Sequence, residues 1–285
     1  MKSKKKMSQE EIDEIKKRYS HDDLPPIKNW PLYIYYNLLR IFSFILVGSG
    51  AILIALIVEP ILILGGKKKF KTRSRKVISA TFNFFINLVS VLGGSKYKFH
   101  GKEKLTNAKG KIIVANHPSY IDVVYLIACI KNADCIIRGT LAKSVFAGVA
   151  RPLYIMNTVG NQEMLDLSKE SLESGANIII FPEGTRTPRH GTNQFKRGAA
   201  RIALNANCGI IPVYIGGSDK YGLGKHDPAF SYLHDGHYVF DIHVLDEIKI
   251  EEYKDMEAQI AARRITERIH KEIADTAMAV DGRIV

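Results

Sequence analysis

The stretch that most constrains this chain is Asn116-His117-Pro118-Ser119-Tyr120-Ile121-Asp122. It follows a short apolar run at 111–115, which is typical of a buried strand. Pro118 disfavours helical dihedral angles at the residue before it, so we expect His117 in a loop. We expect a helix to begin at Ser119, because Ser119 with Asp122 three residues later has the form of a capping box. The stretch therefore predicts a strand, a short loop and a helix in succession.

The chemistry of this turn has two interpretations. An imidazole there, with a carboxylate about one helical turn away, can act as a general base whose charged form the carboxylate stabilises. In the alternative, Asp122 only caps the helix and His117 is an ordinary loop histidine. Ser119 as a nucleophile would need a Gly-x-Ser-x-Gly elbow, which does not surround it. His117 and Asp122 alone do not define a metal site, so we expect no metal here.

Composition and charge narrow the class of protein. The chain has 285 residues, of which 46% are hydrophobic, and this excludes a disordered or fibrous protein. The formal net charge is +12, and no acidic residue occurs between Glu59 and Glu103, whereas lysine and arginine crowd residues 67–76. Such a block can bind nucleic acid or anionic lipid, and the apolar segment beside it favours lipid. The three cysteines, at positions 129, 135 and 208, have no metal-binding spacing and indicate core residues in a reducing compartment.

The N-terminal third predicts membrane association. Residues 1–30 form a basic segment with one exposed helix at 8–19 and no apparent cleavable signal. Residues 41–58 carry no charge over 18 positions, near the lower limit for crossing a bilayer. As one helix, residues 31–64 would be about 50 Å long, which exceeds the ~30 Å hydrocarbon core. One tilted span and a hairpin that returns to the same face both remain open, and a buried core helix is a further alternative.

A second apolar helix is expected at 77–92. It has a narrow polar stripe of Ser79, Asn83, Asn87 and Ser90. At 16 residues it is short for a membrane span, so we expect it to lie along the membrane surface under the following domain. A core helix of that domain is the alternative.

From residue 96 onward, short apolar strands alternate with helices. We expect strands at 97–100, 111–115, 134–138, 177–181, 210–215 and 237–244, and helices at 120–130, 141–151, 161–174, 197–206 and 251–278. The last helix has a packing stripe of Met256, Ile260, Ile265, Ile269 and Ile273. This alternation predicts an α/β fold with a mostly parallel sheet flanked by helices, preceded by an N-terminal helical membrane anchor. The expected divisions are 1–30, 31–95 and 96–285.

A second motif, Glu183-Gly184-Thr185-Arg186-Thr187, follows the apolar run at 177–181 and Pro182. Ligands of open α/β sheets bind beyond the carboxyl ends of strands, where this turn lies. Arg186 suits a phosphate or carboxylate, and Gly184 permits a close backbone approach. Lys196 stands before the next helix, whose amide end also favours an anion. In the alternative, Glu183 and Arg186 merely pair and tie the turn together.

Three blocks in this order resemble the glycerophospholipid acyltransferase family of the 1-acylglycerol-3-phosphate type. They are 116–122, 181–187 and Ile211-Pro212-Val213, and the likeness covers roughly residues 75–220. The resemblance implies that His117 is the base and Asp122 its partner. It also implies that the acceptor is held around the second block, by Glu183, Gly184, Thr185, Arg186 and Lys196, and that the acyl donor lies near Ile211 and Pro212.

The resemblance implies a membrane-associated O-acyltransferase of phospholipid biosynthesis. Such an enzyme moves an acyl chain from a thioester of coenzyme A or acyl carrier protein to a lysophospholipid hydroxyl, with 1-acylglycerol-3-phosphate as the leading acceptor. It implies no cofactor, no metal, no covalent intermediate and no nucleic-acid partner, and a place on the cytoplasmic side of the cell membrane among membrane lipids. The alternatives are a different lipid acceptor, or a non-catalytic membrane protein that binds anionic lipid.

One position departs from the family pattern. Members commonly have an arginine between the two motifs, after an apolar strand, where this chain has Asn157. Arg138, Lys143 or Arg151 could replace that arginine, or the acceptor headgroup could differ.

Overall fold

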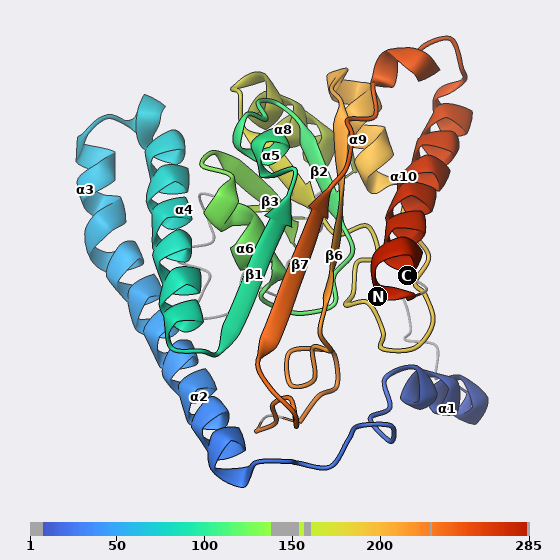
Figure 1. Cartoon of the computed structure of the whole chain (residues 1–285). Coiled ribbons are helices and arrows are strands. Elements are labelled where there is room, and N and C mark those ends of the chain that lie inside the picture. Colours follow the sequence, from blue (N-terminus) through green and yellow to red (C-terminus); the bar gives the residue numbers. More distant parts are fainter. Residues whose placement is uncertain (1–7, 138–153, 157–160, 229, 284–285) are drawn as a thin grey trace.

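The computed structural model describes residues 8–137, 154–156, 161–228 and 230–283 (Figure 1). A seven-stranded sheet has the order β1-β7-β6-β2-β5-β3-β4. The strands are β1 (Ser95–His100), β2 (Ile112–Ala115), β3 (Ala133–Ile137), β4 (Tyr154–Met156), β5 (Asn177–Ile180), β6 (Ile210–Gly217) and β7 (Tyr238–Val244). All neighbouring pairs are parallel except β6 and β7. The predicted mostly parallel α/β fold is confirmed, while β4 was not predicted and the helix expected at 141–151 lies outside the described residues.

Helices cover both faces of this sheet (Figure 1). One face carries α4 (Lys67–Val91) and α6 (Asp122–Cys129), and the other carries α8 (Asn161–Glu173), α9 (Gly198–Ala206) and α10 (Ala258–Asp281). The short α5 (Lys102–Thr106) joins β1 to β2. Along β2, Ile113 and Ala115 enter the first core, whereas Ile112 and Val114 enter the second. Burial on both faces explains why the central strands are continuous apolar runs rather than alternating ones.

The C-terminal helix differs from its prediction. A 3₁₀ turn, η3 (Ile250–Tyr253), precedes α10, which begins only at Ala258. Ile265, Ile269 and Ile273 are buried against the sheet as expected, but Met256 and Ile260 are each 44% exposed. Met256 lies before the helix, and Ile260 lies in its first turn, which extends beyond the core.

The apolar N-terminal run is one continuous helical segment. It comprises α2 (Trp30–Leu53), a π-helical turn η1 (Ile54–Val58) and α3 (Glu59–Leu64). Pro60 cannot donate a backbone hydrogen bond, and the turn before it widens so that the Glu59 N–H reaches Ile54 O. The chain reverses only at Gly65 and Gly66, after which α4 returns beside it (Figure 1). Of the two arrangements left open for residues 31–64, the hairpin within this run is therefore wrong, and the single continuous helix is the one present. The observed hairpin consists of this whole run and α4.

By length and composition, the segment Trp30–Leu64 is long and apolar enough to cross a membrane. Only 11% of its most apolar window is buried inside the protein, so most of its apolar surface faces outward. This observation fits a membrane-facing helix better than the alternative of a buried core helix.

Helix α4 packs as a helix of the core, which was the alternative for residues 77–92. Ile78 and Ile86 are buried against α6, while Phe84 points outward at 63% exposure. Arg75, from the basic block, is also buried and donates to both carboxylate oxygens of Asp134, at 2.7 and 2.5 Å. At least this arginine therefore ties α4 to β3 and does not face lipid.

Candidate active site

The loop that holds His117 starts at a fixed point on the sheet. Asn116 is buried and bonds both ways with the backbone of Ile215 in β6. Its Nδ2 donates to Ile215 O at 2.9 Å, and its Oδ1 accepts from Ile215 N at 2.7 Å. The side-chain amide thus extends the β2–β6 ladder by one residue and sets where the loop leaves the sheet. Sequence reasoning missed this role, because nothing local identifies the partner of a buried asparagine.

His117 and Asp122 form a hydrogen-bonded pair beyond the carboxyl end of β2. The His117 Nδ1 to Asp122 Oδ2 distance is 2.9 Å, with the carboxylate fully buried and the imidazole 19% exposed. An ionised carboxylate only accepts, so a neutral imidazole bonded to it carries its proton on Nδ1. Nε2 then has the lone pair, which is the arrangement of a general base with an orienting acid.

The capping prediction is right in its partners and wrong in where the helix begins. Helix α6 begins at Asp122, not at Ser119. The Asp122 carboxylate reaches back to accept from the Ser119 N–H at 2.8 Å and from its hydroxyl. Because the same carboxylate also holds His117, Asp122 both orders the loop and orients the imidazole. Ser119 is completely buried and bonded to Asp122, which argues against the nucleophile alternative.

Two further contacts fix the imidazole. Its ring stacks on Phe181, which follows β5, with centroids 4.0 Å apart and planes inclined by 19°. The backbone N–H of His117 donates to Glu183 Oε1 at 3.1 Å and to Thr187 Oγ1 at 2.9 Å. The Thr187 N–H in turn donates to His117 O at 2.8 Å. The second motif therefore clamps the loop that carries the first.

Glu183 is the centre of this clamp. Besides the His117 N–H, its carboxylate accepts from the Thr187 hydroxyl and from Asn193 Nδ2, the latter at 2.7 Å. Burial raises the pKa of Glu183, and the bonds from Thr187, Asn193 and the His117 backbone oppose that rise. These partners differ from the simple Glu183–Arg186 pair considered above, and a role of Glu183 at the acceptor stays a prediction.

The other residues of the second motif lie at the surface of the turn. Gly184 has φ +65°, and a Cβ there would stand 2.6 Å from Lys196 Nζ, so the glycine lets this ammonium lie against the turn. Arg186 donates to Gly224 O at 2.9 Å, and its guanidinium lies over the Tyr120 ring at 5.6 Å. Thr185 is partly exposed between them. Two cationic side chains thus belong to the turn next to His117.

Ile211 and Pro212 lie inside the sheet and not at its edge. In the β2–β6 ladder Ile211 is opposite Ile113 and Pro212 is opposite Val114, so both precede the level at which the His117 loop begins. Ile211 is buried in the core that contains α6. Their predicted place beside the acyl donor stays a prediction, and Asn157, Arg138, Lys143 and Arg151 lie outside the described residues.

The apolar helix α2 reaches this region, which the sequence did not indicate. Phe44 packs on Tyr120 with ring centroids 5.6 Å apart, on the ring that Arg186 also contacts. Arg40 donates to Gly222 O at 3.0 Å and to Ser231 O. Burial raises the pKa of Tyr120 to about 12, so its hydroxyl stays neutral. Tyr120 thereby links the His117 loop to the helix that could cross a membrane.

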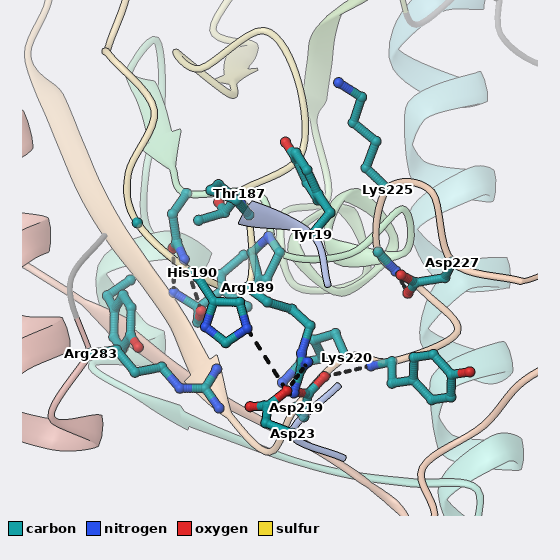
Figure 2. A pocket seen from close by; sticks show the side chains of 18 residues that line it. Tyr19, Asp23, Thr187, Arg189, His190, Asp219, Lys220, Lys225, Asp227 and Arg283 are labelled. Atoms are coloured by element: carbon teal, nitrogen blue, oxygen red, sulfur yellow. Dashed lines mark hydrogen bonds and ion pairs between the residues drawn. The ribbon is translucent and has the colours of Figure 1, made fainter. Parts of the chain in front are cut away.

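A cavity of about 450 Å³ adjoins the loop. Figure 2 shows the side chains that line it. Pro118 and Thr187 line it, but His117 does not, so the hydrogen-bonded pair rather than this cavity defines the candidate site. Arg189 lies between Asp23 and Asp219 at 2.6 and 2.7 Å, and buried Lys220 has its pKa lowered by burial to about 8. Arg189 is thus compensated by two carboxylates, whereas Lys220 donates to the backbone carbonyls of Gly216 and Val239.

The segment after helix α1 (Gln9–Arg18) closes one side of the second motif. Tyr19 is buried and donates from its hydroxyl to Arg186 O at 3.0 Å. Arg18 donates to Asn193 Oδ1 at 2.8 Å and accepts from the His190 N–H through its carbonyl. The helix expected at 8–19 is present, but its end is docked on the site and not exposed.

Comparison with known proteins agrees with this geometry. Residues 96–216, the span that carries both motifs, match the family described as "Acyltransferase". This span of the chain is similar to that family. It is 29% identical over 151 residues to a 1-acyl-sn-glycerol-3-phosphate acyltransferase of Pseudomonas aeruginosa, covering 50% of this chain and 58% of that protein. It is 25% identical over 154 residues to human 1-acyl-sn-glycerol-3-phosphate acyltransferase beta, covering 50% of this chain and 54% of that protein.

A solved structure has a fold similar to that of this chain. The crystal structure of the 1-acyl-sn-glycerophosphate acyltransferase PlsC from Thermotoga maritima aligns with a TM-score of 0.65 over 87% of this chain and 97% of that one. At 18% identity this match concerns the fold alone. The chain spans about half the length of the curated relatives it matches.

Proposed function

We propose that this chain is an O-acyltransferase that moves an acyl chain from a thioester to the hydroxyl of a lysophospholipid. The observation that carries the proposal is the His117–Asp122 pair, 2.9 Å apart, at the strand end of an acyltransferase family domain. The names of the relatives supply the leading acceptor, 1-acylglycerol-3-phosphate.

In the proposed reaction, His117 Nε2 takes the proton of the acceptor hydroxyl while that oxygen attacks the thioester carbonyl carbon. The carbon–sulfur bond then breaks, the ester remains on the acceptor, and the proton passes from the imidazolium to the leaving thiolate. Asp122 stabilises the imidazolium between these steps, because its carboxylate holds the Nδ1 proton at hydrogen-bond distance. General base catalysis of this kind is typically worth ~10²–10⁴ in rate.

We assign the acceptor phosphate to the two cations of the second motif. Arg186 uses one nitrogen for Gly224 O, and a guanidinium has five N–H donors, so further donors can bind a phosphate. Lys196 Nζ lies against Gly184 in the same turn and adds a second positive charge. We assign Glu183 a different role: its carboxylate accepts from the backbone N–H of His117 and so holds the loop in place.

Membrane association is the second part of the proposal. Helix α2 brings Phe44 and Arg40 to the region of Tyr120 and Arg186. Its outward face exposes apolar side chains such as Leu38, Ile45 and Leu53. An acyl chain can therefore stay among lipid next to α2 while its headgroup binds beside His117. The basic residues at the start of α4 suit the anionic cytoplasmic leaflet of the cell membrane.

A matrix of donors and acceptors tests the proposal. Purified protein is given an acyl thioester of coenzyme A or of acyl carrier protein, with lysophosphatidic acid or with a zwitterionic lysolipid of the same acyl chain. We expect acceptor-dependent release of thiol, with lysophosphatidic acid the better acceptor. Transfer to the zwitterionic lysolipid alone would refute the phosphate assignment, and no thiol release with any pair would refute the acyltransferase.

A further inference from the structure

A cluster of two histidines and one aspartate lies at the β1 edge of the sheet, away from the His117 loop. Asp241 Oδ1 is 2.8 Å from His100 Nε2, and Asp241 Oδ2 is 3.1 Å from His243 Nε2. The two imidazole rings stack with centroids 4.1 Å apart and planes inclined by only 9°. One ligand-type atom from each of the three residues lies within 4.8 Å of the others.

The backbone holds these three side chains together. His100 ends β1 and is opposite His243 in the parallel β1–β7 ladder, and Asp241 precedes His243 by two residues in β7. Side chains two apart in a strand share a face, so both β7 residues point the same way. Their neighbours Phe240, Ile242 and Val244 enter the core that contains α4 and α6, so the cluster lies on the opposite face. The three side chains are between 17% and 38% exposed, so solvent reaches them although each is partly buried.

We propose that His100, Asp241 and His243 bind one divalent transition-metal ion, with zinc as the expected ion. Two imidazole nitrogens and one carboxylate oxygen are one of the known sets of three protein ligands at an open zinc site, with the fourth position left for water or another donor. Zinc–nitrogen bonds are about 2.0–2.1 Å long, so the Nε2 atoms need only modest side-chain movement from their places beside Asp241.

The carboxylate is suited to this role. Partial burial raises the pKa of Asp241, but the hydrogen bonds from His243 and His100 outweigh that effect and hold its pKa below the ordinary value. Each of its two oxygens lies beside an imidazole nitrogen, so the carboxylate stands where an ion shared with both histidines would need it. A cluster held only by hydrogen bonds would contain the same atoms, so a measurement of metal binding distinguishes it from a metal site.

The proposed ion would join the edge strand to the sheet and not take part in acyl transfer. β1 directly follows α4, the helix that returns from the membrane-facing run, and in the described residues it pairs only with β7. Since the metal would bind the folded chain and not the separated strands, it should raise the thermal unfolding temperature. No local pattern indicated the site, because 141 residues separate His100 from Asp241.

The test uses untagged full-length protein in detergent, because a polyhistidine tag would bind metal itself. Zinc is added, the protein is dialysed, and the zinc bound per chain is measured by elemental mass spectrometry. In a separate titration with cobalt, the absorption spectrum reports whether these ligands coordinate the ion. We compare wild type with His100→Ala, His243→Ala and Asp241→Asn, and with the control His237→Ala, which removes a histidine just before β7.

We expect wild type and His237→Ala to retain one zinc equivalent more than the three site variants, and to unfold at a higher temperature with zinc than without. Loss of an outer-shell partner alone typically costs about 10–100-fold in metal affinity, so each site variant should bind at least about tenfold more weakly. Asp241→Asn keeps the shape of the side chain and one of its two accepting oxygens, and it serves if the alanine variants fail to fold. Equal zinc content and cobalt spectra in wild type and Asp241→Asn would overturn the proposal and leave a hydrogen-bonded cluster only.

Discussion

Replacing Glu183 with glutamine should slow acyl transfer without weakening acceptor binding. Its carboxylate accepts from the His117 N–H, the Thr187 hydroxyl and Asn193 Nδ2, and it is 4% exposed. Glutamine has the same shape, but its amide can offer only one accepting oxygen where the carboxylate offers two. The new NH₂ group would face Asn193 Nδ2, so two donors would meet where a bond existed.

The expected size follows from the bonds lost. A hydrogen bond to a charged group contributes about 1.5–3 kcal/mol, and about 1.4 kcal/mol corresponds to tenfold in rate. Losing one such bond and loosening the loop should therefore lower kcat about ten- to a hundredfold. The KM for the acceptor should change little, since Arg186 and Lys196 remain in place.

The assay is steady-state thiol release at varied acceptor concentration, with circular dichroism as the check on folding. Glu173→Gln is the matched control, because Glu173 lies exposed on α8 and pairs only loosely with Lys169, at 3.9 Å. An unchanged kcat with a strongly raised KM for the acceptor would refute the reasoning. It would mean that Glu183 binds the acceptor directly and does not position His117.

Two further variants test other parts of the account. Arg186→Ala should raise the KM for lysophosphatidic acid at least about tenfold, which corresponds to the loss of one hydrogen bond to a charged group. The KM for a zwitterionic lysolipid should change less. An equal rise in KM for both acceptors would argue against phosphate binding by Arg186. Lys220→Met should alter how the free energy of unfolding depends on pH. Burial lowers the pKa of Lys220 from 10.5 to about 8. Between these two pH values the unfolded chain binds more protons than the folded chain, so wild type gains stability as pH rises. Denaturant unfolding at pH 8 and 9.5 should show wild type gaining about 2 kcal/mol relative to Lys220→Met, and parallel pH dependence of the two proteins would contradict the buried cation.

The sheet and the loop could be predicted because their causes are local. The strands at 111–115 and 177–181 are buried on both faces and therefore appear as uninterrupted apolar runs. Pro118 and the spacing of His117 and Asp122 place His117 in a loop before a helix, as the structure has it.

What could not be predicted depends on contacts between distant residues. An apolar helix face looks the same whether it meets lipid or protein, so the burial of Ile78 and Ile86 in α4 was not decided by their periodicity. Likewise a basic block does not reveal that Arg75 has a buried partner in Asp134, 59 residues away. The contact of Phe44 with Tyr120 joins two segments that no local pattern connects.

The central claim is that His117, oriented by Asp122, is the base in acyl transfer from a thioester to a lysophospholipid. The most direct measurement compares acceptor-dependent thiol release by wild type and His117→Ala at saturating lysophosphatidic acid. The account predicts a loss of ~10²–10⁴ in turnover, with an unchanged circular dichroism spectrum. Near-normal turnover by a folded His117→Ala variant would contradict it.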